Sequence, residues 1–252
     1  SQFAIIITGD HSQSDLASAE EASVDLDEVL AEFQVVKAGG KWQSGDDLMV
    51  CPNMRAAQIY LRSESSNLRQ QVVDRLLESD GIDQVMWCEA GLEIDDSEDT
   101  TFHVATRDRG SLSFRSTGAE RARGIDHFGG QWCWEGDLRA LDATVDLEGR
   151  LSCGDYPNAF ERVATSFSRQ SGSLWVTARL GREFCLPGTS CNSRGSHGSL
   201  HSLDSTSPLI VAGLPDAIAL PDHIRTVDVV PLCLDILDLQ SEYAVGASHV
   251  TR

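Results

Sequence analysis

The sequence lacks several features that would assign it to a common class of protein. No apolar run approaches the roughly 20 residues that span a bilayer, and no basic segment precedes a signal-like core at the amino terminus. Basic residues are scarce: 20 Lys and Arg against 39 Asp and Glu give a formal net charge of -19. Such a surface repels phosphate backbones. We therefore expect a soluble protein that binds neither membranes nor nucleic-acid backbones.

Paired cysteines are missing as well. The seven cysteines are scattered, and no two of them stand in CxxC spacing. This pattern disfavours a zinc knuckle and a complete disulfide framework. It favours a reducing compartment, so we expect a cytoplasmic location.

Apolar residues are plentiful, at 41% of the 252 residues, and can supply a substantial core. The run Phe3–Thr8 is continuous and rich in β-branched residues, as in a strand buried on both faces of a parallel sheet. Further strands are expected at 47–51, 56–61 and 82–88, with a helix at 66–78. This alternation predicts an α/β fold with a mainly parallel sheet flanked by helices.

Residues 91–150 change character. An acidic loop at 95–99 precedes a hairpin at 102–114 and the Trp132–Trp134 cluster, without a clear period. We expect an inserted cap region that contributes few strands to the main sheet. The tryptophans fit packing, with a substrate platform as the alternative. Beyond the cap, the expected elements are a helix at 158–168, strands at 173–178 and 208–213, and a helix at 226–239.

An Asp–His pair directly follows the first strand. In open α/β sheets ligands gather at the carboxyl ends of strands, where Asp10 and His11 stand. Carboxylate and imidazole suit zinc, manganese or iron. A hydrogen-bonded turn is the alternative. The pairs at 126–127 and 222–223 lack this setting, and we interpret both as structural.

A second candidate is the segment GSHGSLHSLD at 195–204, which precedes the expected strand at 208–213. Its glycines allow His197 to approach a ligand closely, and Asp204 can orient a neighbouring imidazole. A flexible Ser/Gly loop with incidental histidines is the alternative.

The order of these pieces resembles the alkaline phosphatase superfamily, above all its type I phosphodiesterase and nucleotide pyrophosphatase branch. The matching stretches are FAIIITGDHSQSD, GSHGSLHSLDSTSPLIVAG and IRTVDVVPLCLDILDL. DYPNAFERV and the strand near Trp175 also look like the segment that leads to the last metal histidine in bacterial members. The resemblance implies that residues 1–252 are the carboxyl-terminal part of one such α/β domain, with the cap at 91–150.

In that family two divalent metal ions, often zinc, flank a Thr or Ser nucleophile. For this chain we expect zinc, with manganese as the alternative. The resemblance implies that Asp10 and His11 bind the ion that also holds the nucleophile, and that His197 binds the other. No family ligand falls at His201. One ion activates the attacking hydroxyl and the other steadies the leaving oxygen. The implied activity is hydrolysis of a phosphate ester or nucleotide, as a phosphodiesterase or nucleotide pyrophosphatase.

The sequence departs from the family pattern in two places. Ser12 stands where the family usually has glycine, and the nucleophile, a metal-binding Asp and an Asp-x-x-x-His pair have no match, because the family order places them before residue 1. We therefore expect this chain alone to be inactive and to need a complementing amino-terminal segment. The alternatives are a phosphomonoesterase or phosphomutase of the same superfamily, and a non-catalytic module that binds a metal or a partner.

Overall fold

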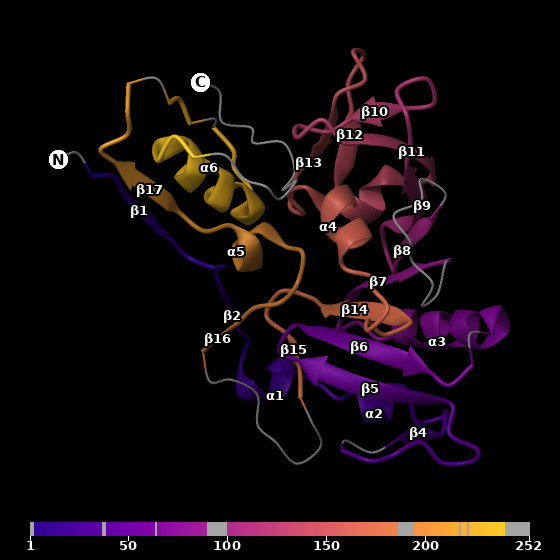
Figure 1. The fold of residues 1–252 in the computed structure, drawn as a ribbon. Helices are drawn as coiled ribbons and strands as arrows, with labels where there is room; N and C mark the ends of the chain where they lie inside the picture. The colour runs from indigo at the N-terminus through magenta and orange to yellow at the C-terminus, as the bar shows by residue number, and fades with distance from the viewer. Residues whose placement is uncertain are drawn as a thin grey trace. The chain divides into compact units, whose positions relative to one another are not determined.

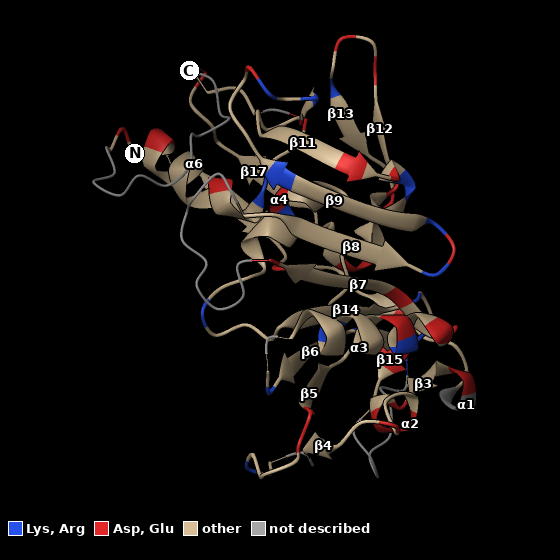
Figure 2. Ribbon diagram, turned by 90° about the vertical axis from the view of Figure 1, so that its right-hand side faces the viewer, with Lys and Arg blue, Asp and Glu red and all other residues tan. Residues whose placement is uncertain are grey.

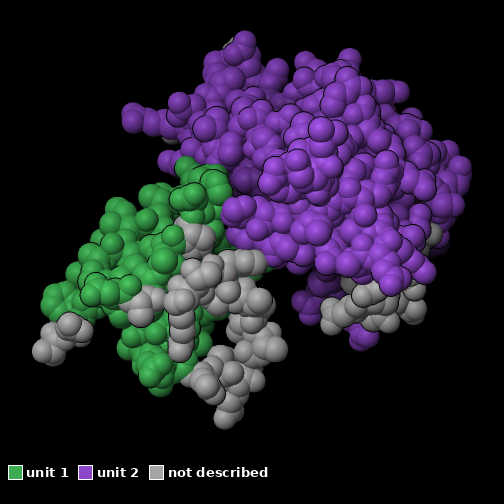
Figure 3. Space-filling model, turned by 90° about the horizontal axis from the view of Figure 1, so that it is seen from above, with its two compact units in different colours: residues 1–12, 206–252 green, residues 13–205 purple. Residues whose placement is uncertain are grey.

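The computed structural model describes residues 3–36, 39–63, 65–89, 100–185, 194–216, 218–220 and 222–239. The chain divides into two compact units, drawn in different colours in Figure 3. Unit 1 combines the segments Ser1–Ser12 and Thr206–Arg252, and unit 2 is the continuous segment Gln13–Ser205.

Unit 2 is built around a nine-stranded sheet. Its strands are β4 (Val35–Val36), β5 (Leu48–Asn53), β6 (Ala56–Leu61), β7 (Ile82–Cys88), β8 (Phe102–Thr106), β9 (Gly110–Ser116), β10 (Gly124–Ile125), β11 (Gln131–Gly136) and β14 (Leu174–Ala178). They lie in the order β10-β11-β9-β8-β7-β14-β6-β5-β4 (Figure 1). Of the eight neighbouring pairs, seven are antiparallel and one, β4 with β5, is parallel.

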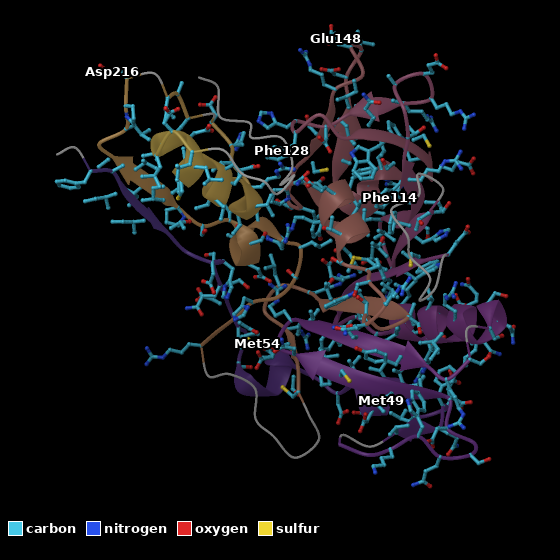
Figure 4. The ribbon with its side chains drawn as sticks, viewed as in Figure 1. Met49, Met54, Phe114, Phe128, Glu148 and Asp216 are labelled. Carbon is cyan, nitrogen blue, oxygen red and sulfur yellow. The ribbon has the colours of Figure 1, made fainter. Side chains whose placement is uncertain are left out.

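The prediction of a mainly parallel α/β sheet is therefore wrong. Two residues, Met54 and Arg55, join β5 to β6, and so tight a turn forces an antiparallel pair (Figure 4). The helix α3 (Ser66–Glu78) does connect β6 to β7, as the alternation suggested. However, β14 lies between those two strands and runs antiparallel to both.

Residues 102–136 supply β8, β9, β10 and β11 of this same sheet. The expectation that the region 91–150 contributes few strands is wrong, because its hairpins extend the sheet from β7. Trp132 and Trp134 are buried on β11, and Trp132 packs edge-on against Phe114 of β9. Phe114 is labelled in Figure 4. The tryptophans therefore belong to the core. The acidic loop at 95–99 lies outside the described residues.

Two hydrophobic clusters occupy opposite faces of the sheet. Neighbouring residues of a strand point to opposite faces, and Val85 belongs to one cluster while Met86 belongs to the other. The first cluster includes the buried face of α3. The second includes Phe160 and Val163 of α4 (Ala159–Thr165). The sheet is thus buried on both sides.

Short elements complete unit 2. They are the ladders β2 (Ser14–Asp15) with β16 (Gly195–Ser196), β3 (Ser23–Val24) with β15 (Glu183–Phe184) and β12 (Ala143–Val145) with β13 (Leu151–Cys153), and the helices α1 (Ala19–Ala22), α2 (Leu26–Val29), η1 (Leu138–Leu141) and α5 (Ser202–Ser205). The β2–β16 ladder places the start of unit 2 beside the GSHG segment.

Unit 1 contains β1 (Ile5–Thr8), β17 (Leu209–Ala212), the 3₁₀ helix η2 (Thr226–Asp228) and α6 (Val229–Ile236). β1 pairs antiparallel with β17. Ile5 and Ile7 of β1 are 46% and 57% exposed, so the expectation of a strand buried on both faces is wrong. A two-stranded sheet leaves one of its faces uncovered within its own unit.

The structure also shows whether a helix could span a membrane and which described cysteines are thiols. Within the described ranges, no helix is long and apolar enough to cross a membrane. Cys185 is disulfide-bonded, whereas Cys51, Cys133 and Cys153 are reduced thiols.

Candidate functional site

Asp10 and His11 follow β1 directly in unit 1. The Asp10 side chain is 88% exposed and that of His11 is 40% exposed. His11 Nε2 lies 3.3 Å from Asp10 Oδ2, and His11 Nδ1 lies 2.8 Å from the carbonyl oxygen of Ser12. Because a carbonyl oxygen only accepts hydrogen bonds, Nδ1 is the protonated donor. The backbone thus orients the imidazole so that Nε2 faces the carboxylate.

The Asp10 carboxylate and the His11 Nε2 atom are spaced as two ligands of one divalent ion. Two ligands of one tetrahedral zinc, each about 2.0–2.1 Å from the metal, are separated by about 3.3–3.4 Å. The Asp10–His11 separation of 3.3 Å matches that distance. An imidazole that donates its other N–H to a backbone carbonyl is also the usual arrangement of a metal-binding histidine. A simple ion pair with protonated His11 has the same geometry, and metal-binding measurements distinguish the two.

His197 belongs to unit 2 and lies between β16 and α5. Its side chain is partly buried, and its carbonyl oxygen accepts a hydrogen bond of 2.9 Å from the Arg55 amide. Asp10 and His11 belong to unit 1, so the convergence of the three residues stays a prediction. Among the residues that the structure describes, no group of three or more His, Cys, Asp or Glu side chains is arranged to hold a metal ion.

His201 has a structural role. It is 9% exposed, and its Nδ1 accepts a hydrogen bond of 3.2 Å from the Leu203 amide in the first turn of α5. Its ring packs edge-on against Tyr156, with 5.7 Å between ring centroids. These contacts explain a buried histidine without a ligand.

Asp204 does not bond to an imidazole in the way the sequence suggested. It is 1% exposed. Its Oδ1 accepts hydrogen bonds from Ser14 Oγ at 2.7 Å and Arg55 Nη1 at 2.5 Å, and its Oδ2 accepts from the amide and hydroxyl of Ser199 at 3.0 and 2.6 Å. We call Ser14, Arg55, Ser199 and Asp204 the Arg55 cluster.

Arg55 is the residue that sequence reasoning missed. It is completely buried, although its charge predicts an exposed position. Besides Asp204, its guanidinium donates to the Arg182 carbonyl at 3.2 Å, to Ser14 Oγ at 2.9 Å and to the Ala178 carbonyl at 2.9 Å. No local pattern around Met54–Arg55 indicates these distant partners.

The charge state of the Arg55 cluster follows from its contacts. Burial alone would raise the pKa of the Asp204 carboxyl, but the hydrogen bonds from Ser199 and Ser14 and the charge of Arg55 outweigh burial and hold that pKa below its ordinary value. Asp204 is therefore ionised at neutral pH. Arg55 and Asp204 form a buried ion pair in which each guanidinium nitrogen and each carboxylate oxygen has at least one hydrogen-bond partner.

The second Asp–His pair, Asp126–His127, differs from the first. The Asp126 carboxylate accepts hydrogen bonds from the amides of Phe128 and Gly130 at 2.9 and 2.8 Å, and from Trp132 Nε1 at 2.7 Å. These bonds use both of its oxygens and close a turn. Asp126 thus has the structural role that we expected.

Acidic residues lie on elements of both units, from α2 and α3 to α6 (Figure 2). The excess of negative charge is therefore spread over the chain. Such a surface attracts cations and repels anions that are not bound to a cation.

No family model, curated protein or solved structure matches this chain. The resemblance to the alkaline phosphatase superfamily rests on the ordered motifs of the sequence.

Proposed function

We propose that this chain supplies metal ligands of a phosphoric ester hydrolase that acts on a phosphodiester or nucleotide. Asp10 and His11 hold one divalent ion, zinc or manganese, and His197 holds a second. The observation that carries the proposal is the Asp10–His11 pair, whose 3.3 Å separation and backbone-oriented imidazole fit one ion directly after β1.

The segments that form unit 1 support the same function. β1 leads into Asp10–His11, β17 follows the GSHG segment, and η2 and α6 contain the IRTVDVVP stretch. β1 and β17 pair from Ile5 opposite Ala212 to Thr8 opposite Leu209. Most of the first matching stretch, the end of the second and all of the third therefore belong to one compact unit, although they come from opposite ends of the chain.

A bound divalent ion lowers the pKa of an attacking hydroxyl and offsets charge on the phosphoryl group. The residues of this chain hold and orient the ion. Asp10 contributes a negative charge, and the Ser12 carbonyl keeps the His11 proton on Nδ1. A net charge of -19 repels a phosphate anion, so substrate binding depends on bound cations.

The proposal is tested by zinc binding, measured by competition with a chromophoric chelator. His11→Ala should weaken binding at least tenfold, because a tetrahedral ion loses a ligand, with about 1.4 kcal/mol corresponding to each factor of ten. His127→Ala is the matched control, since His127 also follows an Asp but that Asp is engaged in a turn. Equal zinc binding by wild type and His11→Ala would contradict the assignment.

Inorganic phosphate provides the second probe. We expect it to bind the zinc-loaded chain and neither the metal-free chain nor the His11→Ala variant, because the acidic surface does not attract an anion by itself. Titration calorimetry measures this binding directly. Zinc binding without zinc-dependent phosphate binding would retain the metal site and exclude the phosphoric ester function.

A further inference from the structure

We propose that the Arg55 cluster positions His197. Through hydrogen bonds before and after that histidine, the cluster sets its backbone and thereby the strength with which His197 binds its ion. The inference rests on the proposed function and deepens it, because it names residues that act through a metal ligand.

The Arg55 cluster enforces one arrangement of the chain. A buried guanidinium or carboxylate is costly unless it is paired and its hydrogen bonds are made. Arg55 and Asp204 are 0% and 1% exposed, and all three guanidinium nitrogens and both carboxylate oxygens have partners. A displaced backbone would leave some of these groups unpaired. The cluster therefore resists small shifts of the segments that it joins.

Those segments lie on either side of His197. On the amino-terminal side, Ser196 of β16 pairs with Ser14 of β2. At His197 itself, the carbonyl oxygen accepts a hydrogen bond from the Arg55 amide. On the carboxyl-terminal side, the Ser199 amide and hydroxyl donate to Asp204. Gly198, between these two attachments, has φ +115, a conformation that a side chain would strain. The backbone of His197 is thus held from both directions.

The Arg55 cluster also includes a residue of the segment that follows Asp10 and His11. Ser14 stands three residues after His11, and its hydroxyl accepts a hydrogen bond from Arg55 and donates to Asp204. The cluster therefore fixes a point close in sequence to each proposed ligand segment. This arrangement suits a role in positioning as well as one in stability.

The test is a zinc titration of the full chain with labelled histidines, in which NMR follows the His11 and His197 imidazole signals separately. In Asp204→Asn we expect the zinc midpoint of His197 to rise about tenfold or more, as for residues that orient metal ligands, while that of His11 changes less than about twofold. Asp126→Asn is the matched control, because Asp126 also accepts three hydrogen bonds in unit 2. It should leave both midpoints unchanged.

A metal-free measurement accompanies the titration. The Arg55 amide donates to the His197 carbonyl, whose position the Arg55 cluster holds. The amide hydrogen of Arg55 should therefore exchange faster in Asp204→Asn than in wild type. If Asp204→Asn does not fold, Ser199→Ala replaces it. That variant keeps the Arg55–Asp204 pair and removes the Ser199 hydroxyl, which donates to Asp204 and accepts from the His201 amide.

The outcomes separate the two proposals. Wild-type midpoints in both Asp204→Asn and Ser199→Ala, with loss of the response in His197→Ala, would overturn the positioning role and leave the metal site intact. A wild-type chain in which zinc moves neither imidazole signal would overturn the proposed function and this inference with it. A selective shift at His197, with faster Arg55 exchange, supports the positioning role.

Discussion

The buried ion pair between Arg55 and Asp204 allows a quantitative prediction about stability. Replacing Arg55 by Met leaves the Asp204 carboxylate buried, with donors from Ser14 and Ser199 alone. Removing one partner of a buried pair typically costs about 3–5 kcal/mol, and we expect a loss of that size for Arg55→Met and for Asp204→Leu. The double variant buries neither charge. Its loss should therefore be smaller than the sum of the single losses, by about 2–3 kcal/mol.

The assay is urea unfolding of the four proteins, followed by tryptophan fluorescence, with the slope of the transition checked for each variant. Additive losses in the double variant, or a loss below about 1 kcal/mol in Arg55→Met, would refute the reasoning, because either result means that the pair is hydrated or uncoupled.

The same pair predicts a pH dependence. The pKa of Asp204 is lower in the folded chain than the ordinary carboxyl value of about 3.9, so its contribution to stability is complete above that value and is lost as the pH falls through the folded pKa. Below about pH 4, the unfolding free energy of Asp204→Leu should therefore depend less on pH than that of wild type. An equal slope in both proteins would contradict the ion-pair assignment.

Three further predictions concern unit 2. Burial lowers the pKa of His103 despite the charge of Glu89, so His103 should titrate below about 6.5 by NMR and lower still in Glu89→Gln; a higher value would contradict this. Gly136→Ala should destabilise the chain more than Gly149→Ala in urea unfolding, because both residues have positive φ but only Gly136 would bring a Cβ against a backbone carbonyl; equal losses would exclude the clash. Leu174→Ala should cost about 2–5 kcal/mol, since Leu174 is 0% exposed in the first cluster; a loss under 1 kcal/mol would place it outside the core.

Local elements followed from the sequence with good accuracy. The strands at 56–61 and 82–88 have the bounds expected of them, and the helix α3 ends at Glu78 as expected, because each contains its own periodicity and end signals. The helix begins one residue earlier than expected, since Ser65 and not Ser66 is its N-cap. Their pairing could not be predicted in the same way. β14 enters the sheet between β6 and β7 from about 90 residues downstream of β7, and periodicity contains no information about such a partner.

The candidate site shows the same contrast. Asp10 and His11 were identifiable because both chemistry and position, directly after an apolar strand, lie in one short stretch. The Arg55 cluster was not identifiable. Arg55 and Asp204 are 149 residues apart, and each looks like an exposed charge in its own surroundings. A buried ion pair is a property of the tertiary fold.

The proposed function requires His11 and His197 to serve neighbouring metal ions, and a paramagnetic ion can test this requirement. Two-metal sites place their ions roughly 4 Å apart, so Mn²⁺ added below one equivalent should broaden the imidazole NMR signals of both histidines together. Asp10→Asn should reduce the broadening of both, and excess zinc should reverse it. Broadening of His11 with an unaffected His197 would contradict the shared centre, and an unaffected His11 would contradict the metal site itself.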